Sequence, residues 1–351
     1  MTDTTPPLAT YPRINPAFTA IVESDDEVTF GAGPWNGPVF EVADEDGDGQ
    51  LARFIAALDG TTHVRDVLDS FEPDAREDLR SVLVALQEKS IVRDAGGPVD
   101  ERRASVGGYL SLEDDDHDDA RRLSRARLAV AGAGEAGRTV ARTLLASGVG
   151  AVEYVDLSPE STGSTLSTDD ERFSRRPDPD LAALFEESTF GVMAVDRPYP
   201  DVARAMNDAA HETGTPWTMG VVNGVDGQVG PTVYPGETAC YECFRDRASA
   251  ATTGTYSAFE TAADRGRAGG PAFATVVSGL VAADVVEQLS GRFGITTGSV
   301  VNFDFDEFAV QADEVLRVPG CETCGRDADR LDSPRHVTVD YLAQHALGGD
   351  E

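Results

Sequence analysis

Four cysteines are the residues of this chain whose type and spacing point most directly to chemistry. They form two CxxC pairs, Cys240 with Cys243 and Cys321 with Cys324, and the chain has no other cysteine. Four thiolates suit a closed tetrahedral zinc site. Because the pairs lie far apart in the chain, zinc would join a loop to the C-terminal strands. A redox pair is the alternative, although a closed site leaves no thiol free to react.

A glycine-rich turn, Gly132-Ala-Gly134-Glu-Ala-Gly137, is the second candidate. A short apolar run precedes it and helical spacing follows it, so its backbone can approach a phosphate at a helix N-terminus. Asp156 ends the next predicted strand, where a carboxylate can bind ribose hydroxyls. The pattern predicts either a nucleotide site or a turn that glycines merely shape in a protein that has lost its nucleotide.

Asp196 is the third candidate, and it follows an apolar strand predicted over residues 190–195. Ligands of open α/β sheets collect at the carboxyl ends of the strands. A carboxylate there can hold the Mg²⁺ of Mg-ATP. A helix cap ahead of Pro198 and Pro200 explains the residue equally well.

The elements that must position these residues follow an α/β pattern from residue 127 onward. Apolar runs predict strands over residues 128–131, 152–155, 190–195 and 217–222 and helices over residues 135–147, 201–211 and 271–289, followed by two strands within residues 299–318. We therefore expect a Rossmann-like α/β domain over residues 121–330. A tail or short helix would follow over residues 331–351.

A smaller domain is predicted over residues 17–94. Short strands over residues 18–22, 28–31 and 39–43, helical spacing over residues 51–58, 64–71 and 73–86, and an extended end at residues 91–92 give a winged-helix-like α+β pattern. Residues 95–120 are rich in glycine and charge, which predicts a flexible acidic linker. The run of residues 44–49, DEDGDG, resembles the start of a calcium loop, but Ile55 stands where the closing carboxylate belongs.

The composition restricts the partners. The chain has 62 acidic against 29 basic residues and a formal net charge of −33, which disfavours binding to nucleic acid and to anionic membranes. Lys89 is its only lysine. Acid excess with lysine depletion is typical of proteins from salt-accumulating cells such as haloarchaea. No secretory signal is recognisable, and Ser278 and Asp284 interrupt the longest apolar stretch, so we expect a cytoplasmic protein that does not span a membrane.

Several of these motifs together resemble the ThiF/MoeB-like fold of the ubiquitin-activating superfamily, over roughly residues 120–330. They are the glycine turn, Asp156, Asp196, the segment of residues 223–228 (NGVDGQ), and the sequence PGETACYECF with its late CxxC. The resemblance implies adenylation of the C-terminal carboxylate of a small protein or peptide. It also implies a magnesium-coordinating, catalytic Asp196, a structural zinc on the four cysteines, and a homodimer.

The N-terminal part resembles the PqqD-like peptide-recognition domain of ribosomal-peptide maturation systems. The resemblance rests on residues 57–68, ALDGTTHVRDVL, with Leu86 and residues 91–94, IVRD. The two domains together are similar to the precursor-peptide-binding component of azoline-forming cyclodehydratases, which serve bacteriocin-type biosynthesis. This implies that a leader peptide pairs with residues 28–31 or 39–42 and packs on the helix of residues 73–86. A generic winged helix is the alternative.

The chain departs from the sequence pattern of active adenylating members of this superfamily, and this leaves more than one function open. The stretch LSPESTGSTLST follows Asp156, and no lysine lies between Asp156 and Asp196; Arg172, Arg175 and Arg176 are the cations there. Our first hypothesis is a zinc-stabilised scaffold that presents a precursor peptide to an ATP-using YcaO-type cyclodehydratase. The second is an adenylyltransferase that binds Mg-ATP at Gly132, Gly134, Gly137, Asp156 and Asp196. A nicotinamide dehydrogenase is a third, in which the CxxC pairs have no role.

Overall fold

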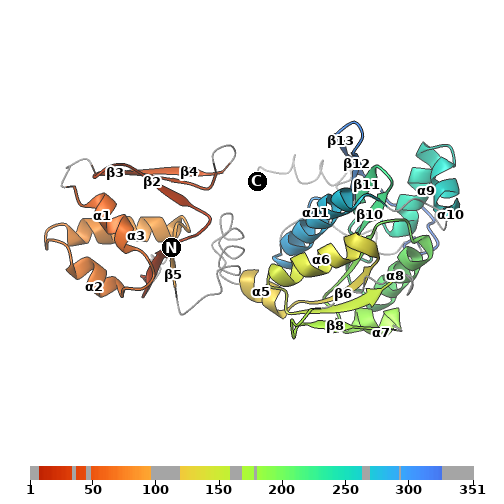
Figure 1. Cartoon of the computed structure of the whole chain (residues 1–351), viewed down its shortest axis with the longest axis horizontal. Helices are drawn as coiled ribbons and strands as arrows, with labels where there is room; N and C mark the ends of the chain where they lie inside the picture. The colour runs from red at the N-terminus through yellow and green to blue at the C-terminus, as the bar shows by residue number, and fades with distance from the viewer. Residues whose placement is uncertain are drawn as a thin grey trace, which may run out of the picture. The chain divides into compact units, whose positions relative to one another are not determined.

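A computed structural model describes residues 8–33, 37–44, 49–95, 119–158, 168–177, 180–262, 269–291 and 294–325. The chain divides into two units, residues 1–122 and 123–351 (Figure 1). Three of the sequence-based expectations fall largely outside the described residues. They are the calcium-like run at residues 45–48, the linker over residues 96–118, and the tail over residues 331–351.

Unit 1 contains a three-stranded antiparallel sheet and three helices. The strands are β2 (Thr19–Ser24), β3 (Glu27–Gly31) and β4 (Val39–Ala43), the helices are α1 (Leu51–Ala57), α2 (Val64–Asp69) and α3 (Arg76–Glu88), and β1 (Pro12–Ile14) pairs with β5 (Val92–Asp94). The sheet and the helices share one core, to which Phe30, Phe54 and Leu83 each contribute a fully buried side chain. The predicted small α+β domain is confirmed, although β1 was not foreseen.

Unit 2 is built on an eight-stranded sheet with the order β13-β12-β11-β10-β9-β6-β7-β8. Its strands are β6 (Arg127–Gly132), β7 (Ala151–Asp156), β8 (Phe173–Arg175), β9 (Phe190–Val195), β10 (Trp217–Asn223), β11 (Asp226–Val229), β12 (Ser299–Asp304) and β13 (Ala309–Glu314). From β8 to β10 the neighbours are parallel, and from β10 to β13 they are antiparallel. The parallel part confirms the predicted Rossmann-like α/β class.

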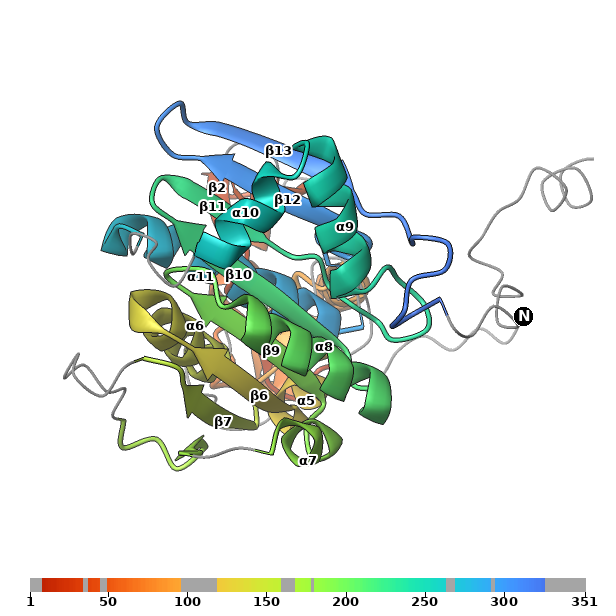
Figure 2. The same ribbon diagram turned by 90° about the vertical axis from the view of Figure 1, so that its right-hand side faces the viewer.

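Helices cover both faces of this sheet (Figure 2). On one face lie α6 (Gly134–Ala146) and α11 (Pro271–Leu289), and on the other lie α7 (Leu181–Glu186), α8 (Pro200–Thr213) and α9 (Tyr241–Ala251), with α10 (Thr255–Ala262) beside α9. The remaining helix, α5 (Asp119–Arg125), precedes β6. Strands buried on both faces explain the continuous apolar runs in the sequence, such as the fully buried β9.

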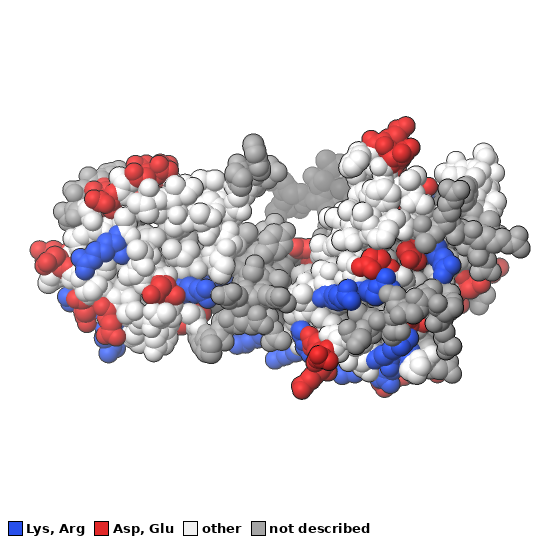
Figure 3. Space-filling view, in the orientation of Figure 1, with Lys and Arg blue, Asp and Glu red and all other residues white. Residues whose placement is uncertain are grey.

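The helix α11 is long and apolar enough, by length and composition alone, to cross a membrane, but half of it is buried inside unit 2. Its Ser278 hydroxyl donates a 3.0 Å hydrogen bond to the carbonyl oxygen of Ala136 in α6. A Cβ on Gly220 of β10 would overlap Val281, so the helix packs directly on the sheet. We therefore describe α11 as a core helix of unit 2. Figure 3 shows acidic and basic side chains interspersed on the visible face of each unit.

Candidate functional site

The glycine turn joins β6 to α6, as its sequence predicted. A Cβ on Gly132 or on Gly137 would overlap the hydroxyl group of Tyr154 and the backbone of the other glycine. Gly134 has a φ of +61°, a conformation that glycine adopts without strain. Burial, reinforced by the charge of Asp156, raises the pKa of Tyr154. The three glycines are therefore needed for packing and backbone geometry, whether or not a nucleotide binds.

Asp196 follows the last residue of β9, and its carboxylate lies against Gly134. A Cβ on Gly134 would overlap both the carboxyl carbon and an oxygen of Asp196. The structure thus brings together two residues that lie 62 positions apart in the sequence. The helix-cap interpretation of Asp196 is wrong, because α8 begins at Pro200 with Tyr199 as its N-cap residue and no side-chain cap.

Asp156 lies at the end of β7, at the same edge of the sheet, but its carboxylate already has partners. Oδ2 accepts a 2.9 Å hydrogen bond from Arg175, and Oδ1 accepts one of 3.0 Å from the backbone N–H of Ser158. The hydroxyl oxygen of Ser158 in turn accepts a 3.1 Å hydrogen bond from the backbone N–H of Gly134. The N–H and the carboxylate that a nucleotide would use are therefore bound within the chain.

The arginines that could replace the missing lysine are engaged as well. Each pairs with a carboxylate: Arg172 with Asp170 at 2.6 Å, Arg175 with Asp156 at 2.9 Å, and Arg176 with Glu153 at 2.8 Å. The carboxylate of each pair offsets the charge of its arginine, so the pair attracts a triphosphate less than a free arginine would. This arrangement argues against these arginines as ligands of the ATP phosphates.

Tyr199 links the strands on either side of the turn. Its hydroxyl donates a 3.3 Å hydrogen bond to the carbonyl oxygen of Leu157, which follows β7. The Nε of Arg197 donates to the same hydroxyl at 3.1 Å, and its guanidinium lies 5.5 Å from the centre of the Tyr199 ring. Since β6 lies between β9 and β7 in the sheet, this contact passes over the carboxyl end of β6.

A cavity of about 360 Å³ lies beside Tyr199, between the sheet and the ends of α8, α9 and α10. Its polar lining includes the amide side chains of Asn223, Gln228 and Asn302, and Asp226 is its one carboxylate. Among the described residues that line the cavity there is no lysine or arginine. Burial, and secondarily the charge of Asp304, raises the pKa of Asp226. The amide groups of the described lining can form hydrogen bonds with an uncharged ligand.

The four cysteines gather in one buried cluster. All four Sγ atoms lie within 4.8 Å of one another, and Cys243 is 3.3 Å from Cys324 and 3.8 Å from Cys240. A tetrahedral zinc with bonds of about 2.3 Å places its sulfurs about 3.8 Å apart. Hydrogen bonds from Cys240 and Cys243 lower the pKa of Cys324 to about 3, so one thiolate is already favoured. The donor set and its spacing fit a structural zinc ion.

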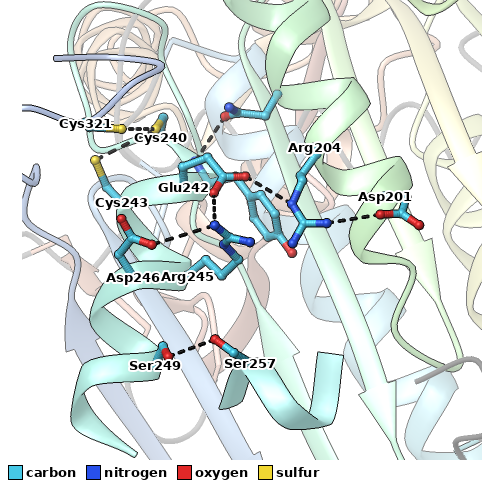
Figure 4. Close-up of polar contacts among 12 residues, drawn as sticks. Asp201, Arg204, Cys240, Glu242, Cys243, Arg245, Asp246, Ser249, Ser257 and Cys321 are labelled. Carbon is cyan, nitrogen blue, oxygen red and sulfur yellow. Dashed lines mark hydrogen bonds and ion pairs between the residues drawn. The ribbon is translucent and has the colours of Figure 1, made fainter. Parts of the chain in front are cut away.

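The helix that follows Cys240 is tied to α8, as Figure 4 shows. The side chain of Asn207 accepts a 3.0 Å hydrogen bond from the backbone N–H of Tyr241. Glu242 pairs with Arg204 of α8 at 3.4 Å and with Arg245 of its own helix at 2.6 Å. The N–H of Val318 donates to the sulfur of Cys243 at 3.2 Å. The cluster therefore fastens α8, α9 and the C-terminal loop together.

Within the described residues, β4 pairs with β3 alone, and its other edge, here called the free edge, is the feature of unit 1 that bears on peptide binding. Flanking hydrogen bonds join Ala32 to Pro38 and Asp44 to Asp26. The alternation of an antiparallel ladder then points the N–H and C=O groups of Val39, Glu41 and Ala43 away from β3. Residues 28–31 cannot accept a peptide strand, because β3 is paired on both sides. Of the two expected positions for a leader peptide, only residues 39–42 lie at an edge.

The third helix of unit 1 reaches this edge. The ammonium group of Lys89, at the end of α3, lies 6.0 Å from the centre of the Phe40 ring in β4. Phe40 and Val42 are partly buried against the core, whereas Val39 and Glu41 are exposed. The strand therefore presents polar backbone groups beside an apolar surface.

Two site residues escaped the sequence reasoning. Ser158 and Tyr199 belong to no motif, and both act through a single hydroxyl group that depends on the folded chain. Their one sequence signal is position, since each lies within four residues of the end of a parallel strand. That edge is where ligands of α/β sheets collect.

Comparisons with known proteins agree with this architecture. The ThiF family model matches residues 163–323. A search of curated proteins found no match. A structure of the heterocyclase TruD is 18% identical in sequence, with a TM-score of 0.62 over 91% of this chain. A structure of a heterocyclase in complex with substrate and cofactor is 17% identical, also with a TM-score of 0.62 over 91% of this chain. The chain spans about two fifths of these proteins, 43% and 39% of their respective lengths.

A shorter protein is similar over nearly its whole length. The structure of Escherichia coli MccB with ATP has a TM-score of 0.58 at 16% identity, with 90% of this chain and 99% of MccB covered. Another MccB structure contains AMPCPP and MccA. At these identities the likeness establishes the fold, which this chain shares with the heterocyclases and MccB.

Proposed function

We propose that this chain is the precursor-peptide-binding, ThiF-like component of a ribosomal-peptide heterocyclisation system. Unit 1 would capture the leader peptide, and an ATP-using YcaO-type partner would form the thiazole or oxazole precursors. The chain itself then acts as a scaffold and activator.

The observation that carries this proposal is the free edge of β4 beside α3. A peptide strand added there gains main-chain hydrogen bonds from Val39, Glu41 and Ala43. Its alternate side chains would lie toward Phe40 and the end of α3, where Lys89 is placed. The edge therefore offers both an unpaired backbone and an apolar surface to one extended peptide.

The bonds at the glycine turn support a separate catalytic partner. The backbone N–H of Gly134 is bound to Ser158, and the carboxylate of Asp156 is bound to Arg175. These internal bonds favour a role in which this chain does not use ATP itself.

The proposal includes a structural zinc ion on the four cysteines, a homodimer and a cytoplasmic location. The zinc rests on the sulfur spacing of the cluster. The homodimer and the location rest on the family resemblance and the acidic composition. Nucleic acid is not among the proposed partners, because the net charge of −33 repels phosphate backbones.

An ATP-dependent adenylyltransferase is the second candidate. The contact of Asp196 with the glycine turn favours it, because this places a carboxylate where a magnesium ligand belongs. The near-complete coverage of MccB, in a structure with ATP, favours it too. Such an enzyme would activate the C-terminal carboxylate of a ubiquitin-like or sulfur-carrier protein.

Reconstitution separates the two candidates. Neighbouring genes for a YcaO-type enzyme and a short Cys/Ser/Thr-rich peptide would supply its components. We expect ring formation, seen by mass spectrometry as loss of one water per ring, only when this chain, the enzyme and ATP are all present. Pyrophosphate exchange by this chain alone, abolished in Asp196→Ala, would instead identify the adenylyltransferase.

A further inference from the structure

The first turn of α6 has the geometry of an anion site, yet its donor is already used. Backbone N–H groups at a helix N-terminus bind phosphate oxygens. Here the N–H of Gly134 donates to the hydroxyl oxygen of Ser158 at 3.1 Å. Ser158 is itself held by the 3.0 Å hydrogen bond from its backbone N–H to Asp156. A serine oxygen thus stands where a phosphate oxygen would bind.

Tyr199 holds the segment after β7 from the side of β9. Its hydrogen bond to the carbonyl oxygen of Leu157 connects the end of β9 with the end of β7, across β6. Arg197 donates to the tyrosine hydroxyl and lies over its ring. The Tyr199 contact and the Ser158 contact come from different segments, and both converge on residues 156–158. Together they hold the segment that carries Ser158 against the glycine turn.

We propose that Ser158 and Tyr199 form a built-in closure of the glycine turn, which keeps a nucleotide out until the closure opens. The residues that would hold the nucleotide are present beneath it, since Gly134 lies against the carboxylate of Asp196. The apparent affinity for a ligand falls with the fraction of molecules in the open state. Loosening the closure should therefore tighten nucleotide binding without creating any new contact.

The test measures Mg-ATP binding to the full chain by calorimetry in concentrated KCl. Ser158→Ala frees the Gly134 N–H, and Tyr199→Phe removes the bridging hydroxyl but keeps the ring. We expect each to bind Mg-ATP at least about tenfold more tightly than the wild type, and the double variant to bind most tightly. Ser158→Thr keeps a hydroxyl and should bind like the wild type.

Ser147→Ala is the matched control, because it makes the same change after the last residue of the same helix. It should leave binding unchanged. Equal binding by the wild type, Ser158→Ala and Tyr199→Phe would overturn the closure, whether all of them bind Mg-ATP or none does. If the melting temperature of Tyr199→Phe shows that it does not fold, the comparison of Ser158→Ala with Ser158→Thr tests the closure. The closure concerns unit 2 alone, so its failure would leave peptide capture by unit 1 standing.

Discussion

The carboxylate of Asp196 occupies the space that a side chain at Gly134 would fill. The two residues come from the ends of adjacent parallel strands, and their contact shapes the candidate nucleotide site. Gly134→Ala should therefore carry two penalties. A φ of +61° costs an L-residue about 1–2 kcal/mol, and the new methyl group must also displace Asp196. We expect the free energy of unfolding of Gly134→Ala, measured by chemical denaturation, to be lower than that of the wild type by more than about 2 kcal/mol.

Gly214→Ala separates these two penalties. Gly214 has a φ of +77° at the end of α8, but a Cβ there meets nothing within 4 Å. The free energy of unfolding of Gly214→Ala should therefore fall only by the cost of the positive φ. An equal fall in Gly134→Ala and Gly214→Ala would contradict a tight contact between Gly134 and Asp196.

The cysteine cluster predicts one zinc ion per chain. Cys240→Ser or Cys321→Ser should release the metal, measured by mass spectrometry of metal content. Unfolding stability should fall by more than about 3 kcal/mol, because structural zinc contributes about 10–16 kcal/mol of binding energy in small zinc domains. Since all four cysteines lie in the cluster, the metal-loaded protein should also show no thiol reactive toward a colorimetric reagent.

Ser249→Ala tests whether such effects are specific to the metal. Ser249 lies on α9 and bonds to Ser257 at 2.8 Å, away from the sulfurs (Figure 4). The zinc content of this variant should stay at one ion per chain. Purified wild-type protein with far less than one zinc would refute the site.

Asp226 predicts a pH-dependent effect on stability. It lies directly opposite Asp304 in the β11–β12 ladder, and burial together with this neighbour raises its pKa. A raised carboxyl pKa favours folding at low pH, and this contribution disappears as the pH rises through the folded-state pKa. Asp226→Asn should therefore stabilise the protein at pH 7 by about 0.2–1 kcal/mol.

The gain from Asp226→Asn should shrink as the pH falls through the pKa of Asp226, because both proteins are then uncharged at this position. Thermal melts of the variant and the wild type from pH 7 to pH 4 follow this difference. Asp306→Asn, in the turn after β12, is a control without a cross-strand carboxylate in the ladder. A constant or growing gain from Asp226→Asn at low pH would be inconsistent with the raised pKa.

The sequence predicted most reliably those elements whose apolar pattern the core requires. The strand β9 and the helix α11 have the predicted bounds, because every residue of β9 is buried and α11 packs on the sheet. In contrast, β11 was missed. Its sequence, DGQV, is polar at two of four positions, and it becomes a strand only by pairing with β10 and β12.

In the candidate site, too, the sequence could not predict contacts that form only in the folded chain. Motif spacing located the glycine turn, Asp156, Asp196 and the cysteines, because backbone geometry and ligand chemistry restrict which residues can stand there. It could not show that Arg175 is bound to Asp156, since the partner of a surface arginine depends on how a loop returns to the sheet. Nor could it show that Arg172 and Arg176, two of the cations between Asp156 and Asp196, are bound to carboxylates of the chain.

Binding of the precursor peptide to the edge of β4 tests the central claim most directly. Fluorescence anisotropy of the labelled peptide encoded beside this chain compares the wild type with Glu41→Pro, which removes an outward N–H while leaving the β3–β4 hydrogen bonds in place. Val22→Pro makes the same change on β2, at the opposite edge of the sheet. The account predicts at least about tenfold weaker binding for Glu41→Pro and unchanged binding for Val22→Pro. Wild-type affinity in a folded Glu41→Pro protein would contradict it.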